Sequence, residues 1–132
     1  MNPSFRALTF LVLLFATQCV LPPVPDPRHA PPPVLMPVNL SATEQAYVRD
    51  VGDVLSRYGF DPVDRGSADH LLEFDIDEGP VNVVTSIRLL ESGRIIAHGQ
   101  GRASGPPLIR RHQIVEDSFY QALREFEDRL RH

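Results

Sequence analysis

Two stretches of the chain carry apolar residues at a helical period. The first follows Ser41 and stops before Gly59, and the second runs from near Arg110 to the end of the chain. In each stretch the apolar positions recur every three or four residues, which places them on one face of a helix. The apolar sets are Tyr47, Val48, Val51, Val54, Leu55 and Tyr58 in the first stretch, and Val115, Phe119, Ala122, Leu123, Phe126 and Leu130 in the second.

Local signals mark both ends of the first helix. Ser41 and Glu44 have the spacing of a capping box, in which the serine hydroxyl accepts an amide hydrogen and the glutamate reaches back to the serine N–H. Gly59 predicts the end of the helix, because glycine readily adopts the left-handed conformation that closes helices. A folded domain is therefore predicted to begin at Ser41.

Between the helical stretches, apolar and polar residues alternate, which is the pattern of half-buried strands. Turn signals at Glu78-Gly79-Pro80 and Ser92-Gly93 divide this part into three strands. Small residues on the third strand are expected to let a helix approach closely. The residues expected to face the helices are Leu72, Phe74 and Ile76, then Val81, Val83, Thr85, Ile87 and Leu89, then Ile95, Ala97, Gly99, Gly101 and Ala103.

This order of elements predicts an α+β fold, a two-layer sandwich built as helix, three-stranded antiparallel meander and helix. Each helix has one apolar stripe and each strand one apolar face, so both helices are expected on the same face of the sheet. The domain is predicted to span residues 41–132. The strand order and a short edge strand near Val63 are left open.

The N-terminal pattern is of a different kind. Residues 7–15 form an apolar run without charge, behind a short leader that carries Arg6. Such a run suits a secretory signal and is shorter than the roughly 20 residues that a membrane-spanning helix needs. Residues 1–18 are therefore interpreted as a signal peptide, which leaves Cys19, the only cysteine, directly behind it. The alternatives are a secreted protein with a stray cysteine and an uncleaved signal anchor.

The residues Ala16, Thr17, Gln18 and Cys19 resemble the lipobox of bacterial lipoproteins, although Gln18 stands where a small residue is usual. The resemblance implies cleavage before Cys19 and acyl chains on its sulfur. It also implies the outer membrane as destination, because Val20 occupies the place where an aspartate retains such proteins in the inner membrane.

Residues 20–40 contain eight prolines. Because proline fixes φ and lacks an N–H, we expect neither sheet nor helix there, but an extended polyproline conformation. Residues 19–40 are thus predicted to be a lipid-anchored, semi-rigid tether that holds the domain away from the bilayer.

Composition and motifs argue against several classes of function. The net charge is −4, and all 13 basic residues are arginine. The chain has no basic stripe of the kind that nucleic-acid-binding domains usually carry. Because it contains no lysine, catalysis through a Schiff-base lysine and phosphate binding by a P-loop lysine are excluded. The histidines lack zinc-ligand spacing, and no nucleophile elbow surrounds a serine. We therefore expect no enzyme, no cofactor and no metal.

Three carboxylates, Glu73, Asp75 and Asp77, share one face of the first predicted strand. They could ligate calcium or act as an acid–base pair. We interpret them instead as a solvated face that pairs with arginines such as Arg88 on the next strand, because opposite charges across strands stabilise sheets.

Arg110 and Arg111 stand at the start of the last helix, where the helix dipole disfavours cations. With Arg102 they form a hypothetical binding site for an anion, together with free helix amides. The alternative is that the helix begins a residue or two later, with these arginines in solvent or paired with Glu116 and Asp117.

These patterns together predict an outer-membrane lipoprotein, anchored through a lipid on Cys19, with a small binding or assembly domain facing the periplasm. The expected partner is an envelope protein or an anionic envelope ligand. The topology resembles small envelope-assembly lipoproteins such as the partner of the lipopolysaccharide-export barrel, a resemblance that carries no site residues. A tethered periplasmic enzyme and a purely structural envelope protein are the alternatives.

Overall fold

The structure is a computed structural model that describes residues 30–106 and 110–132. The compact folded unit spans Pro31–His132. The predicted signal peptide (residues 1–18), Cys19 and the first part of the predicted tether lie outside the described residues.

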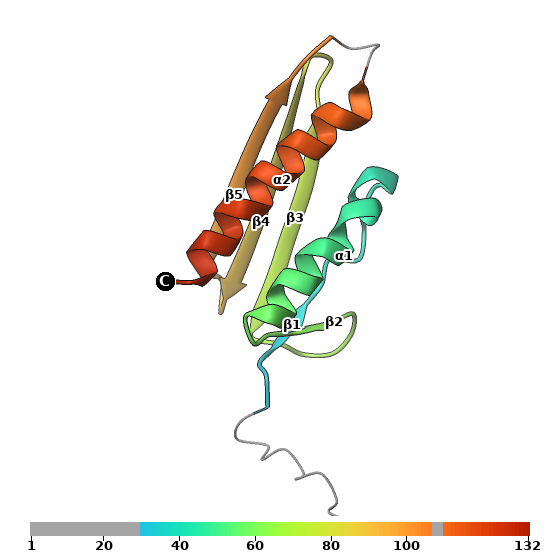
Figure 1. The fold of residues 1–132 in the computed structure, drawn as a ribbon. Helices are drawn as coiled ribbons and strands as arrows, with labels where there is room; N and C mark the ends of the chain where they lie inside the picture. The colour runs from blue at the N-terminus through green and yellow to red at the C-terminus, as the bar shows by residue number, and fades with distance from the viewer. Residues whose placement is uncertain (1–29, 107–109) are drawn as a thin grey trace, which may run out of the picture. The chain divides into compact units, whose positions relative to one another are not determined.

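The described residues form two helices and one five-stranded sheet (Figure 1). The strand order is β2-β1-β3-β4-β5, in which β3, β4 and β5 are antiparallel while β1 runs parallel to both of its neighbours. The elements are β1 (Pro33–Leu35), α1 (Ala42–Arg57), β2 (Asp61–Val63), β3 (His70–Glu78), β4 (Asn82–Glu91), β5 (Arg94–Ser104) and α2 (Arg111–Leu130).

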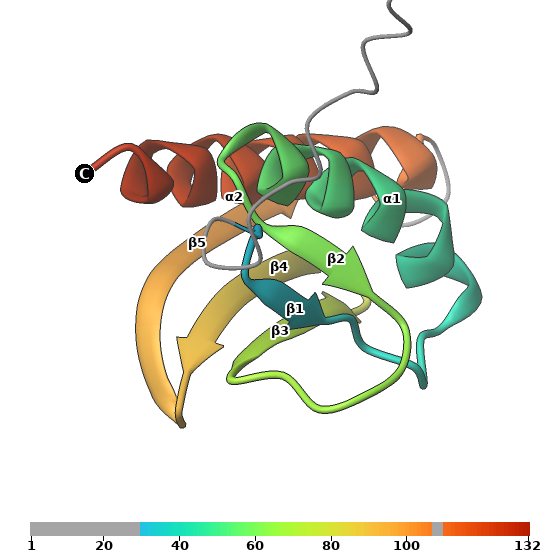
Figure 2. The ribbon, with the colours of Figure 1, turned by 90° about the horizontal axis from the view of Figure 1, so that it is seen from below.

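The predicted α+β class and the antiparallel meander are confirmed, whereas the prediction of only three strands is wrong. The sheet is mixed, because β1 and β2 join the meander along the β3 edge. Both helices cover the same face of the sheet, as predicted (Figure 2). Helix α2 packs on β4 and β5, and α1 packs beside β2 and β3.

Strand β1 lies in the stretch that was predicted to form neither sheet nor helix, and that prediction is wrong for Pro33–Leu35. Proline is tolerated here because Pro33 is the first residue of the strand, before pairing with β3 begins at Val34. The side chain of Val34 is 0% exposed, so it belongs to the core. The folded unit accordingly begins before Ser41.

A second proline, Pro62, sits in the edge strand β2, where its missing N–H faces away from the sheet. The hydrogen bonds that join β1 and β2 come from the residues around it. Asp61 donates its N–H to the Pro32 carbonyl, and Met36 donates to the Val63 carbonyl, both at 2.9 Å. Two proline-containing segments therefore form a regular parallel ladder without losing a bond.

The core centres on Phe119 of α2, which is fully buried. Its ring lies 4.6 Å from the ring of Tyr47 and 5.9 Å from that of Phe74, measured between centroids. One residue thus contacts an aromatic side chain from α1 and another from β3. Burial of such rings supplies much of the hydrophobic free energy in a small domain.

Glycines on β5 let α2 approach closely, as predicted. A Cβ atom on Gly101 would collide with the Ser118 carbonyl oxygen of the helix backbone. The Ser118 hydroxyl also donates to the Gly101 carbonyl at 3.1 Å and lies 2.9 Å from the Thr85 hydroxyl. The contact between helix and strand is therefore made by backbone and short polar groups.

A β-bulge changes the direction of the side chains near the start of β5. Leu89 faces Ala97 across the strands, but Leu90 faces Ile95, so Ile96 is an extra residue. The prediction that Ile95 faces the helices is therefore wrong, and its side chain is 55% exposed. Val81 was also expected to face the helices, but it lies in the turn before β4 and is exposed.

The predicted capping box at Ser41 is confirmed, and Glu44 does more than cap the helix. Its carboxylate accepts the Ser41 N–H at 2.7 Å and the N–H of Ile76 on β3 at 3.0 Å. Burial by itself would raise the pKa of Glu44, but these hydrogen bonds, with one from the Ser41 hydroxyl, lower it below the usual value. The ionised carboxylate therefore holds α1 to the unpaired edge of β3.

Replacing Glu44 with glutamine is expected to lower the free energy of unfolding by about 1–3 kcal/mol near neutral pH, because two charge-assisted bonds are lost. The folded-state pKa lies below the unfolded one, so the stabilisation is present above the ordinary pKa of 4.5 and is lost as pH falls through the folded-state value. Urea unfolding at a series of pH values measures the difference. Glu116→Gln, on the exposed face of α2, is the control. An equal loss at all pH values would contradict this role.

Candidate functional site

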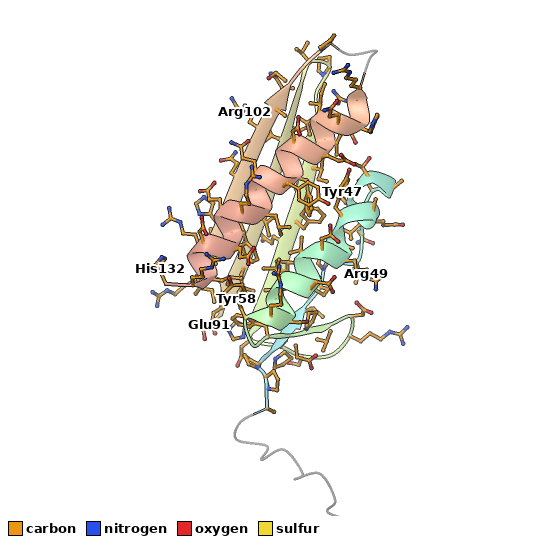
Figure 3. All side chains as sticks on the ribbon, in the orientation of Figure 1. Tyr47, Arg49, Tyr58, Glu91, Arg102 and His132 are labelled. Atoms are coloured by element: carbon orange, nitrogen blue, oxygen red, sulfur yellow. The ribbon has the colours of Figure 1, made fainter. Side chains whose placement is uncertain are left out.

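The three arginines of the predicted anion site line three different hollows. Arg102 lines one of about 260 Å³ between β5 and α2, together with His98. Arg110 lines one of about 450 Å³ after β5, and Arg111 lines one of about 320 Å³ between the first turns of the two helices. Figure 3 shows Arg102 on β5, far along the hairpin from Glu91. The structure does not bring the three side chains around one hollow.

Arg111 is already engaged within the fold. Its Nη2 donates to the Gly79 carbonyl at 2.7 Å, and its Nε lies 3.4 Å from Glu78 Oε2. The Thr43 hydroxyl donates to the other oxygen of Glu78 at 2.7 Å. Arg111 therefore fixes the β3–β4 turn against the helices. Arg110 is the N-cap residue of α2, in the left-handed conformation, and makes no side-chain cap bond.

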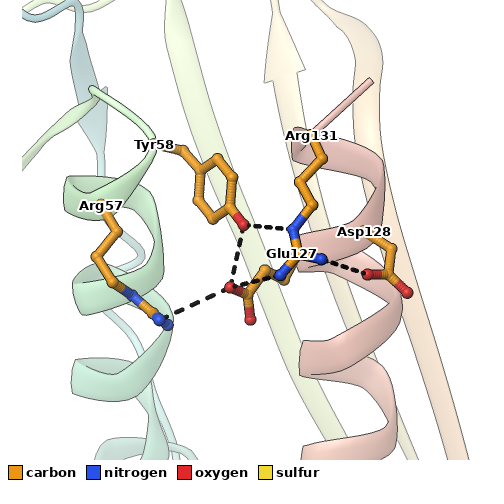
Figure 4. A network of polar contacts seen from close by, with 5 residues as sticks. All are labelled: Arg57, Tyr58, Glu127, Asp128 and Arg131. Atoms are coloured by element: carbon orange, nitrogen blue, oxygen red, sulfur yellow. Dashed lines mark hydrogen bonds and ion pairs between the residues drawn. The ribbon is translucent and has the colours of Figure 1, made fainter.

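The polar groups at the C-terminal ends of the two helices are paired with one another (Figure 4). Arg131 donates to the Tyr58 hydroxyl at 2.8 Å, and this hydroxyl donates to Glu127 at 3.1 Å. Arg57 of α1 forms an ion pair with the same carboxylate at 3.7 Å. This network joins α1 to α2.

Two features are absent from the part of the chain that the structure describes: a metal-binding cluster and a membrane-spanning helix. Within residues 30–106 and 110–132, no three His, Cys, Asp or Glu side chains are grouped so that they could hold a metal ion. Neither helix in these ranges combines the length and the apolar character needed to cross a bilayer.

The sheet face opposite the helices, called the open face from here on, has no helix over it among the described residues (Figure 2). Residues on it alternate with the buried ones along each strand. One apolar residue from every strand lies on this face at the same level, because each is the register partner of the next. This apolar row consists of Val63 on β2, Leu35 on β1, Leu71 on β3, Leu90 on β4 and Ile95 on β5.

The row is exposed to solvent mainly on β3 and β5. Leu71, Ile95 and the bulge residue Ile96 are 40%, 55% and 44% exposed. Ile96 lies beside Ala97, which points to the helices, so Ile96 points to the open face. The bulge thus places two neighbouring isoleucines on the same surface, where a regular strand would place one. Half of the large apolar side chains exposed among the described residues gather here.

Charged and polar residues occupy the rest of the open face in two columns. The acidic column on β3 is Glu73, Asp75 and Asp77, and the column on β5 is His98, Gln100 and Arg102. Each member of one column stands at the level of one member of the other, with a β4 residue between them. The cross-strand triplets are Glu73–Arg88–His98, Asp75–Ser86–Gln100 and Asp77–Val84–Arg102.

The predicted pairing of the acidic column across the strands is confirmed for Glu73, whose Oε2 lies 2.9 Å from Arg88 Nη2. Asp75 has no such partner within the part of the chain that the structure describes. Its partial burial raises its pKa, the negative charges of Glu44 and Asp77 raise it further, and Arg88 offsets only part of the effect. The centre of the β3 column is therefore a carboxyl group that forms no ion pair with any described residue.

The sequence contains one signal for this surface. Leu90 and Ile96 are apolar, although the alternation places both on the polar faces of their strands, away from the core. Their alignment with Leu35 and Val63 depends on strands that the alternation did not reveal.

Comparison of the chain with protein-family models, with curated proteins and with solved structures finds no match.

Proposed function

We propose that the chain is an outer-membrane lipoprotein, anchored through Cys19 and facing the periplasm, whose domain is a binding or assembly module. The export-type run that ends at the only cysteine supports the anchor. The open face of the sheet is the proposed binding surface.

The proposal that the open face binds a partner rests on the exposed part of the apolar row. Contiguous apolar surface with a polar rim is typical of protein interaction sites, and interfaces have an apolar centre surrounded by polar residues. The row at Leu71, Leu90 and Ile95, beside the two polar columns, has this arrangement.

A protein partner suits this surface better than a small anionic ligand. Recognition of an anion would need the arginines to converge, whereas Arg102, Arg110 and Arg111 line separate hollows. An enzyme would need converging polar groups in an apolar pocket. The polar groups near the helices, such as Glu78 and Glu127, are instead paired within the fold.

The anchor gives a direct prediction. The native protein is expected to carry acyl chains on Cys19. Two or more such chains would make the membrane anchoring stable. Cys19→Ser is expected to abolish incorporation of labelled fatty acid and to remove the protein from the outer-membrane fraction. Gln18→Ala, which brings the sequence closer to the lipobox, is the matched control and should retain the label. Intact-mass spectrometry that finds a cleaved native protein without lipid would refute the anchor.

A further inference from the structure

We propose that a second copy of this chain occupies the open face, so that two copies form a symmetric dimer with their sheets packed face to face. The inference rests on the proposed use of the open face as a binding surface and names its partner. It follows from the register of β3, β4 and β5 and from the distribution of charge on that face.

The edges of the sheet are poor sites for self-association. On β5, the N–H groups of Gln100 and Arg102 point away from β4 and are bound by side chains of α2, Glu125 at 3.2 Å and Gln121 at 2.9 Å. These bonds cover the edge that would otherwise pair with another strand. The opposite edge, β2, has only three residues and contains Pro62. Contact through the face is therefore favoured over contact through an edge.

The open faces of two copies are complementary when a twofold axis relates them. This axis runs parallel to β4 and lies midway between the two faces. Rotation about this axis preserves the level along the strands and exchanges the places of β3 and β5. The β3–β5 part of the apolar row, Leu71, Leu90 and Ile95, then lies on the same part of the second copy, with Leu71 opposite the partner copy's Ile95. Sheets that stack in this way are about 10 Å apart and cross at about −30°.

The same axis places the acidic column of one copy opposite the β5 column of the other, which carries no negative charge. Glu73 faces His98 of the partner copy, Asp75 faces Gln100, and Asp77 faces Arg102, because the members of each pair share a level. An axis across the strands would instead stack carboxylate on carboxylate, or would bring only the apolar rows together. Complementary charge selects one orientation of two partners, and here it selects the axis along β4.

Residues on β4 lie near the axis and meet their own counterparts. Leu90 then contacts the same residue of the second copy, which completes the apolar centre. Arg88 would also face its counterpart, but its guanidinium group is paired with Glu73 at 2.9 Å within the chain. Contact between identical patches is the usual form of a twofold interface.

Crosslinking in the membrane tests the geometry on the full chain. Ser86 lies on the open face of β4, so Ser86→Cys places a thiol near the axis. A short bismaleimide whose arm matches the spacing of about 10 Å between stacked sheets is expected to give a covalent dimer. Ser56→Cys, on the exposed side of α1, is the matched control and should give no covalent dimer, and neither should the native chain. Ile95→Asp in the Ser86→Cys chain is expected to lower the dimer yield about tenfold or more, whereas the equally exposed Val81→Asp should not.

A charge-swap experiment tests the pairing between copies. Asp77→Arg alone and Arg102→Asp alone should each weaken the dimer, because like charges then face each other. When the two variants are expressed together with different tags, each Arg at position 77 faces an Asp at position 102, so mixed dimers should outnumber dimers of either variant. An effect within one chain cannot produce this preference.

The outcomes separate the two proposals. If Ser86→Cys gives no dimer but Ile95→Asp still reduces the size of the native complex in mild detergent extracts, the second copy is wrong and the open face binds another protein. If the native complex is unchanged by Ile95→Asp and no dimer forms, the binding role of the open face is wrong as well. Random pairing of the swapped variants would refute the proposed axis.

Discussion

Gly101→Ala is expected to lower the free energy of unfolding by about 3 kcal/mol or more, or to remove the cooperative transition. A Cβ at this position collides with the Ser118 carbonyl and comes within 2.8 Å of the Ala122 backbone nitrogen. Because these atoms belong to the helix backbone, no side chain can rotate away, and α2 itself would have to move. Overpacking of this kind costs up to about 3 kcal/mol or occasionally more, out of a total of roughly 5–15 kcal/mol.

Gly52, a buried glycine on α1, gives the control. A Cβ on Gly52 of α1 would lie 3.6 Å from Met36 Cε and 3.9 Å from Pro62 Cγ, which are ordinary contacts. Gly52→Ala is therefore expected to leave stability unchanged or to raise it by up to about 1 kcal/mol, since alanine favours the helix. Denaturant unfolding monitored by circular dichroism compares the two. A native midpoint for Gly101→Ala would show that α2 does not rest on β5 as closely as described.

The elements that were predicted correctly have local signals. The capping box at Ser41, the apolar stripes of both helices and the turn at Ser92-Gly93 depend on residues a few positions apart. The turn residues both have positive φ, 49° and 80°, as a tight hairpin requires. Such signals act before any tertiary contact forms, so the sequence alone predicts them.

The elements that were missed depend on partners far away in the sequence. Only Val34 and Leu35 of β1 are apolar, and the strand exists because it lies between β2 and β3, which follow it by roughly 30 residues. The bulge at Ile96 likewise appears only when β4 and β5 are aligned. The alternation of apolar and polar residues along one strand reveals neither the neighbours of β1 nor the bulge at Ile96.

The same distinction explains the candidate sites. The arginine hypothesis used a local rule about the first turn of a helix, and Arg111 proves to be bound to Gly79 and Glu78 across the domain. The apolar row is a property of the register of five strands, and no single segment reveals it. Leu90 was visible as an apolar residue on a polar face, but its alignment with Leu71 and Ile95 was not.

Val34→Asp tests whether the proline-rich stretch belongs to the fold, and it is expected to prevent cooperative folding. The side chain is 0% exposed, and β1 joins β2 to the rest of the sheet, so an unpaired carboxylate there costs several kcal/mol and removes both contacts. Val38→Asp is the matched control, because Val38 lies four residues further on and is 73% exposed. It should change stability by no more than about 0.5 kcal/mol. Thermal unfolding of both variants gives the comparison, and equal melting temperatures would mean that the domain starts at Ser41 and that β1 adds nothing to its stability.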